Sequence, residues 1–253
     1  MEHLTIPLWS LALLVIVALA FDFMNGFHDG ANSISTIVAT GALTPKQAVL
    51  FAAFFNFAAL WVFELKVAAT IGKGTVDPAL VDHVVIFGAL MGALAWNVIT
   101  WYYGIPSSSS HALVGGLVGA TVIKAGGLTP IVWSGFGKIL IFIVISPLVG
   151  FLIGGLLMVL VAWVFRNRSP YQAGKWFKGG QLFAAAAYSL GHGGNDAQKT
   201  IGIIWMLLIA TGYAGAGESS PPLWTIISCY AAIAVGTMFG GWRIVKTMGQ
   251  KIT

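Results

Sequence analysis

Two carboxylates stand in apolar surroundings, each with a histidine and glycines just before it. Asp29 lies in residues 25–40, NGFHDGANSISTIVAT, which follow an apolar run that begins at Leu8. Asp196 takes the corresponding place in residues 191–202, GHGGNDAQKTIG. An ionisable group at membrane depth is costly, so its presence indicates a function, although each aspartate could instead form a structural pair with a neighbouring histidine or lysine. Shielded carboxylates can bind Na⁺ or carry a proton, and the glycines predict helix breaks that expose backbone groups to a ligand.

A run of serines supplies a second kind of chemistry. Ser107 to Ser110 follow Pro106 and precede His111 and the glycine-rich apolar residues 113–125. Hydroxyls and free N–H groups at a helix N-terminus suit a small anion such as phosphate, which has oxygens on all sides. A plain N-cap would need only one serine. A serine–histidine nucleophile is an alternative, but adjacency in sequence does not supply the geometry of a catalytic pair.

The second aspartate motif carries a cation that the first lacks. Lys199 stands where the first motif has Asn32, three residues after the aspartate. That spacing places its ammonium on the same helix face as Asp196, where it would neutralise the carboxylate and exclude Na⁺. We therefore predict proton coupling, with Asp29 as the proton carrier. The alternative is that Lys199 faces a loop and leaves a sodium site intact.

Three histidines occur one per motif, at His28, His111 and His192. We expect them to act as hydrogen-bonding or proton-transfer helpers. The alternative is that they coordinate a divalent metal together with the aspartates.

The composition places these motifs in a membrane. The chain has 253 residues, of which 58% are hydrophobic and only 8% are charged. Soluble domains have about 25% charged residues, so we predict an all-α, multi-pass protein of the cell membrane. The net charge of +5 comes from Lys and Arg clustered in loops, so it does not predict nucleic-acid binding. The single cysteine, Cys229, cannot form an internal disulfide.

The apolar runs predict the elements that position the motifs. They indicate spans at 8–43 (interrupted by the first motif), 47–65 and 84–103, a re-entrant segment at 113–125, and further spans within 131–165, 181–210 and 223–241. Residues 131–165 are too long for one crossing, so we expect either a division at Pro147 or a start that lies along the surface. The charge pattern predicts a cytoplasmic loop at 166–180 and an external loop at 211–222.

The paired motifs also predict internal symmetry. Glycine-flanked aspartates in two halves of one chain are typical of inverted-repeat carriers, whose site lies at the repeat interface and whose repeats rock against each other. We assign residues 1–165 to a first repeat, 166–180 to the basic loop, and 181–253 to the start of an incomplete second repeat.

These motifs resemble those of the inorganic phosphate transporter family, the Pit-type symporters. The family signature is approximately GxNDxAN in each half, with a Pro-x-Ser-Thr-x-His element after it. The chain reads FHDGAN at 27–32, GNDAQK at 194–199 and PSSSSH at 106–111. The resemblance covers nearly the whole chain. It implies a carrier that moves phosphate, alone or as a metal–phosphate complex, together with H⁺ or Na⁺.

The resemblance implies roles for the motif residues, with no resident cofactor and no enzymatic activity. Phosphate is expected to bind Ser108, Ser109, Ser110, Asn32, Asn195 and Lys199. The coupling cation is expected at Asp29, Asp196, Asn25 and Asn32, with His28, His111 and His192 as helpers. The remaining alternatives are an intramembrane hydrolase based on serine and histidine or on a metal, and a binding subunit that does not transport.

The chain departs from the family pattern at three points. His28 replaces the asparagine that usually precedes the first aspartate, and Lys199 replaces an asparagine in the second motif. The spacing from Asp29 to Ser108, repeated after Asp196, would place a second serine element beyond Thr253. We therefore expect a fragment of a longer carrier, or a protein whose half-site is completed by another chain; a homo-oligomer also stays open.

Overall fold

The computed structural model describes residues 6–64, 74–214 and 220–249, and its regular structure is helical apart from one isolated bridge between Val76 and Ile131. The elements, in chain order, are α1 (Leu8–Asp29), α2 (Ala31–Ala39), α3 (Pro45–Val62), the 3₁₀ turn η1 (Pro78–Leu80), α4 (His83–Tyr103), α5 (Ser109–Ala125), α6 (Trp133–Phe165), α7 (Pro170–Ala210), α8 (Leu223–Phe239) and α9 (Trp242–Thr247).

Four stretches in the described residues are long and apolar enough to cross a membrane. They are Leu8–Ala39, Pro45–Val62, His83–Tyr103 and Trp133–Phe165, and α8 is a shorter apolar helix. The prediction of an all-α, multi-pass membrane protein is confirmed.

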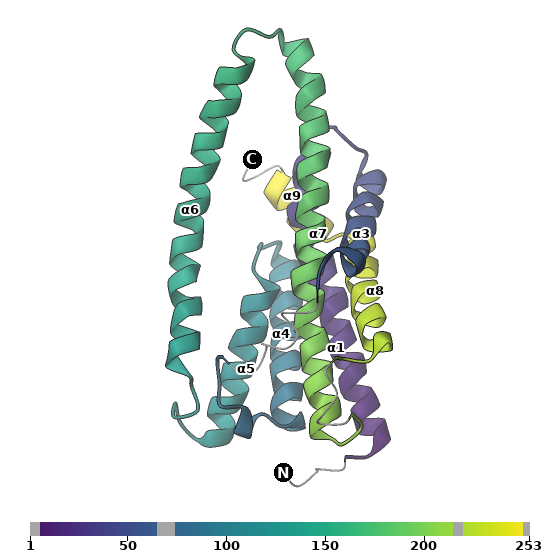
Figure 1. The fold of residues 1–253 in the computed structure, drawn as a ribbon, viewed down its shortest axis with the longest axis vertical. Helices are drawn as coiled ribbons and strands as arrows, with labels where there is room; N and C mark the ends of the chain where they lie inside the picture. The colour runs from purple at the N-terminus through teal and green to yellow at the C-terminus, as the bar shows by residue number, and fades with distance from the viewer. Residues whose placement is uncertain (1–5, 65–73, 215–219, 250–253) are drawn as a thin grey trace.

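The bundle is built around α1, α7 and α8, with α3 against α7 and α8 (Figure 1). α1 and α7 run in opposite directions, so the two aspartate motifs approach each other from opposite ends. Glycines let α1 and α8 touch backbone to backbone. A Cβ on Gly26 would lie 2.0 Å from the Ile233 carbonyl oxygen, and one on Gly236 would lie 2.0 Å from that of Phe23. In a bilayer the hydrophobic effect does not drive helices together, so helix association depends on close packing, which small residues allow.

α4 and α5 form an antiparallel hairpin whose tip carries the serine run (Figure 1). Gly104 ends α4 in the left-handed conformation, with φ 68°, and Ser108 caps α5. At the other end of the hairpin, the Lys124 ammonium lies 2.7 Å from the carboxylate of Asp82, which caps α4. α5 is a 17-residue helix that packs back along α4, as expected for a re-entrant segment.

The predicted helix breaks are wrong for the second motif and nearly absent in the first. α7 runs without interruption through residues 191–202. Between α1 and α2 only Gly30 leaves the helix, and its φ of −55° and ψ of −24° are still right-handed helical values. The glycines serve packing instead, since a Cβ on Gly193 would lie 2.3 Å from the Asn56 carbonyl oxygen. Glycine permits a helix break, but here the glycines allow close helix packing and the helix continues.

Two further expectations concern residues 131–180, and of the two alternatives for 131–165 the division at Pro147 is wrong, whereas a start along the surface stays a prediction. α6 is one helix of 33 residues that continues through Pro147. The predicted loop at 166–180 is only a short turn, because α7 begins at Pro170 with Ser169 as its N-cap. α6 stands apart from the bundle, and no residue of it is buried against the described chain (Figure 1). Lys66, Lys73 and Glu218, which belong to the predicted loops, lie outside the described residues.

Candidate functional site

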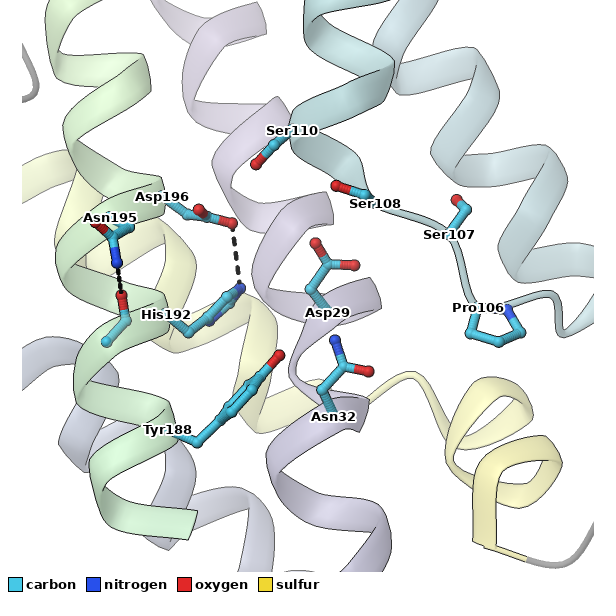
Figure 2. A pocket seen from close by; sticks show the side chains of 11 residues that line it. Asp29, Asn32, Pro106, Ser107, Ser108, Ser110, Tyr188, His192, Asn195 and Asp196 are labelled. Carbon is cyan, nitrogen blue, oxygen red and sulfur yellow. Dashed lines mark hydrogen bonds and ion pairs between the residues drawn. The ribbon is translucent and has the colours of Figure 1, made fainter. Parts of the chain in front are cut away.

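A cavity of about 620 Å³ lies where the tip of the α4–α5 hairpin meets α1, α2 and α7 (Figure 2). Its lining is polar in character and comes from segments far apart in the sequence. The lining residues are Asp29, Asn32, Pro106, Ser107, Ser108, Ser110, Tyr188, Gly191, His192, Asn195 and Asp196.

Asp29, at the end of α1, is held between a histidine and the start of α5. Its Oδ1 lies 2.9 Å from Nδ1 of His28, and its Oδ2 accepts a hydrogen bond from the Ser109 N–H at 3.3 Å. The other ring nitrogen of His28 lies 2.9 Å from the Thr100 hydroxyl. The buried His28 ring therefore links Asp29 to α4 and does not line the cavity.

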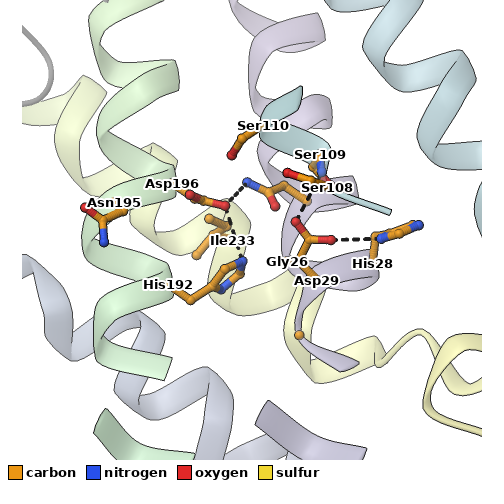
Figure 3. A network of polar contacts seen from close by, with 12 residues as sticks. Gly26, His28, Asp29, Ser108, Ser109, Ser110, His192, Asn195, Asp196 and Ile233 are labelled. Atoms are coloured by element: carbon orange, nitrogen blue, oxygen red, sulfur yellow. Dashed lines mark hydrogen bonds and ion pairs between the residues drawn. The ribbon is translucent and has the colours of Figure 1, made fainter. Parts of the chain in front are cut away.

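Asp196, on α7, is surrounded by three donors or potential donors, of which Figure 3 labels His192. The Lys199 ammonium lies 2.5 Å from Oδ1, and the Asn25 amide donates to Oδ2 at 3.1 Å. Nε2 of His192 lies 3.5 Å from Oδ2. Lys199 also donates to the Ser110 hydroxyl, so it joins the second motif to the hairpin tip. The expected placement of Lys199 on the face of Asp196 is confirmed.

The serine run forms the N-terminus of α5. The Ser108 hydroxyl accepts the His111 N–H at 3.3 Å, which is an N-cap hydrogen bond. Ser107, Ser108 and Ser110 line the cavity. Ser109 is fully buried, and its hydroxyl has no hydrogen-bond partner in the described part of the chain. Hydroxyls and the positive end of the helix dipole are thus directed to the same space as the two carboxylates.

The charges in this space restrict what can bind there. Asp29 and Asp196 are both shielded, each with 7% of its surface exposed, and Lys199 is the ammonium that contacts one of them. A negative ligand about 4 Å from an unneutralised carboxylate is repelled by about 4 kcal/mol at an effective dielectric constant of 20. Neutralisation of the carboxylates would therefore favour an anion in this space.

One group of side chains in the described residues has the composition of a metal site. Ligand atoms of Asp29, His192 and Asp196 all lie within 4.8 Å of one another. Two carboxylates and an imidazole suit several divalent cations, although Lys199 beside Asp196 opposes a further positive charge.

The remaining predicted residues take several positions. Asn32, His192 and Asn195 line the cavity, and the Asn195 amide donates to the Gly191 carbonyl of its own helix at 2.8 Å. Asn25 and Lys199 reach the site by contacting Asp196. His111 lines a separate hollow with Trp96 and other residues.

Sequence reasoning missed Tyr188 and did not assign Ser107. Tyr188 precedes His192 by four residues on α7, so helical spacing alone would have placed both on one face. Its hydroxyl faces Asn32 across the cavity (Figure 2).

The geometry does not support a serine–histidine nucleophile. The Ser110 hydroxyl accepts from Lys199, and the described residues contain no hydrogen bond between it and the His111 ring.

Comparisons with known proteins identify the family of the chain. The profile of the phosphate transporter family matches residues 25–253. A probable low-affinity inorganic phosphate transporter from Rhizobium meliloti (strain 1021) is 56% identical over 240 residues, which are 95% of this chain and 71% of the relative. A protein of the same description from Mycobacterium bovis (strain ATCC BAA-935 / AF2122/97) is 44% identical over 248 residues, so the chain spans 59% of that relative. A solved structure of a sodium-dependent phosphate transporter has the same fold, with a TM-score of 0.79 and 23% identity over 97% of this chain and 79% of that one.

Proposed function

Because the chain belongs to the phosphate transporter family, we propose that it imports inorganic phosphate across the cell membrane by symport with a cation. The relatives are named as transporters, and the chain is not an enzyme. The observation that carries the proposal is the meeting of the α5 N-terminus with Asp29 and Asp196 in one cavity.

The phosphate ligands in this proposal come from both motifs and the hairpin tip. The hydroxyls of Ser108 and Ser110 and the amides of Asn32 and Asn195 would donate to phosphate oxygens, as Ser109 would if its N–H were released from Asp29. Lys199 would add a point charge when it turns from Asp196 and Ser110 towards the anion.

In this proposal the two carboxylates couple phosphate binding to cation binding. Phosphate and two ionised aspartates repel each other, so each cation that neutralises an aspartate raises the phosphate affinity. By linkage, phosphate raises the affinity for that cation by the same factor. The transported pair then moves together as the repeats change their relative orientation.

We propose the proton as the coupling cation. The Lys199 ammonium at 2.5 Å occupies the position next to Asp196 that a sodium ion would need. Asp29 has no lysine or arginine ion pair in the described part of the chain, lines the cavity and can exchange a proton with its water. Sodium coupling is the alternative, and the sodium dependence of the structural relative favours it.

The test is uptake of labelled phosphate by reconstituted vesicles under separately imposed Na⁺ and pH gradients. We expect the pH gradient alone to drive accumulation. Lys199→Asn should create Na⁺-dependent uptake, because it vacates the position beside Asp196 and restores the residue found in the first motif. Lys178→Asn, on an exposed part of α7, is the matched control and should behave as the unaltered chain.

Three results would change the proposal. Strict Na⁺ dependence without any response to the pH gradient would replace the proton by sodium. Uptake that stops when divalent cations are chelated would favour a metal–phosphate complex, held by Asp29, His192 and Asp196. Phosphate binding without uptake would indicate a binding subunit that needs a second chain.

A further inference from the structure

A third carboxylate, Asp22, lies in the seam between α1, α7 and α8, about two helical turns before Asp29. It is fully buried. Its Oδ1 accepts a hydrogen bond from the Thr200 hydroxyl at 2.5 Å. Its Oδ2 has no partner within hydrogen-bond geometry in the described residues, and the weak thiol donor of Cys229 faces the carboxyl group. Half of this carboxyl group therefore lacks the stabilisation that a buried anion requires.

The groups that face Asp22 do not neutralise it. From α7 these are Asp196 and Lys199, and from α8 they are the Cys229 thiol and the Tyr230 phenol. The Lys199 ammonium contacts Asp196 and the Ser110 hydroxyl. α4 has no charged residue after His83, and the described residues contain no ion pair to Asp22. A buried carboxylate without a counter-ion is costly, whereas the neutral acid is not.

Asn25 carries, on the same helix, a second acceptor oxygen without a donor in the described residues. It lies three residues after Asp22, on the same face of α1, and is also buried. Its amide nitrogen donates to Asp196, whereas its Oδ1 has no donor in the described chain. Two buried acceptor oxygens, three residues apart on α1, thus lack a donor in the described chain, and a proton on Oδ2 of Asp22 would turn one of them into a donor.

A proton fits this seam better than a metal ion. Hard cations take six or more oxygen ligands, whereas the side chains facing Asp22 from α8 are a thiol and a phenol. The adjoining α1 and α8 backbones are in contact at Gly26 and Ile233, which leaves little space for a solvated ion (Figure 3).

We propose that Asp22 is a second proton site of the transport cycle, protonated in this conformation. This inference rests on the proposed function. One proton adds to Oδ2 of the carboxylate, forms an O–H bond and leaves the group neutral; loss of that proton restores the anion. Asp29 exchanges protons with water in the cavity, and Asp22 retains a proton away from water. The Thr200 hydroxyl donates to Asp22, and the adjacent Lys199 contacts Asp196, so the charge of Asp22 acts on the phosphate site.

The test combines infrared spectroscopy with transport by the reconstituted chain. At neutral pH we expect a protonated-carboxyl band that shifts in heavy water, is lost in Asp22→Asn, and remains in Asp82→Asn, a matched change outside the seam. Asp22→Asn should lower phosphate accumulation driven by a pH gradient about tenfold or more, while phosphate–phosphate exchange without a gradient stays within about twofold. A band that persists in Asp22→Asn, or unchanged gradient-driven accumulation by that variant, would overturn the proposal.

A second variant keeps the test decisive if Asp22→Asn fails to insert. Thr200→Val removes the hydrogen bond to Oδ1, so it should shift the frequency of the same band without removing it. An unshifted band would contradict the assignment to Asp22. If the unaltered chain neither exchanges nor accumulates phosphate, the proposed function fails, and the band still reports separately on the protonation of Asp22.

Discussion

At the residue scale, Asp29 occupies the position that an anionic ligand would take. Its carboxylate accepts the Ser109 N–H at the N-terminus of α5, where backbone donors and the helix dipole favour negative charge. Phosphate entering the cavity would compete with this internal anion. Protonation of Asp29 would weaken that hydrogen bond, so under the proposed proton coupling the same proton would also make the binding position available.

The first prediction concerns the hydroxyls. Ser108→Ala combined with Ser110→Ala should weaken phosphate binding about 10²-fold to 10⁴-fold, because each of the two hydroxyls that donate to a charged ligand contributes about 1.5–3 kcal/mol. Titration calorimetry of the detergent-solubilised chain measures the change. The loss of the Ser108 cap should lower stability by only about 1 kcal/mol.

Ser109→Ala is the control for that experiment. Its hydroxyl is buried beside the cavity, and the substitution keeps the N–H that Asp29 accepts. Phosphate affinity should stay within about twofold of the original value. If Ser109→Ala weakened binding as much as the double variant, the assignment of Ser108 and Ser110 would be lost.

Local spacing predicted the contacts within one helix better than contacts between helices. The three-residue interval between Asp196 and Lys199 was enough to predict their ion pair. The hydrogen bond between Thr200 and Asp22 joins residues far apart in the chain, and no local pattern indicates it. The assignment of Asp22 to a function therefore depends on the packing of α1, α7 and α8.

At the element scale, glycines explain both the tight packing and the failed prediction of helix breaks. Gly26 and Gly193 were expected to open their helices, but each lies against a backbone carbonyl of another helix. A glycine in the sequence shows that many backbone conformations are allowed at that position. The conformation that is adopted depends on the packing of the neighbouring helix, which the sequence does not show. The prediction of a loop at 166–180 was wrong, because α7 already begins at Pro170. A cluster of charged residues indicates a segment outside the bilayer, but such a segment can still be helical.

Gly26→Ala tests the seam between α1 and α8. Its Cβ would lie 2.0 Å from the Ile233 carbonyl oxygen, so the helices must separate. We expect a loss of about 3 kcal/mol or more in the free energy of unfolding, measured by denaturation in detergent. Gly150→Ala, in α6, meets no atom within 4 Å and should be neutral or slightly stabilising. Equal effects of the two substitutions would contradict the tight seam.

At the scale of the whole molecule, the opposite directions of α1 and α7 agree with the inverted repeats that the paired motifs predict (Figure 1). The division of the chain into repeats at 165 and 181 stays a prediction. The turn between α6 and α7, with Arg166 and Arg168, lies at one end of the molecule, and residues 211–214, which follow α7, lie at the other. The assignment of these two ends to the cytoplasmic and external sides stays a prediction.

The isolation of α6 has a consequence for the lipids around it. Residues 139–165 carry no charged side chain and extend about 40 Å, whereas the hydrocarbon core of a typical bilayer is about 30 Å thick. This hydrophobic mismatch forces the helix to tilt or the bilayer to thicken. Because α6 follows α5 after a short turn, its tilt acts on the hairpin that carries the serines. We expect the transport rate to vary with lipid acyl-chain length in reconstituted vesicles, and an unchanged rate from short to long chains would show that α6 tilts independently of the hairpin.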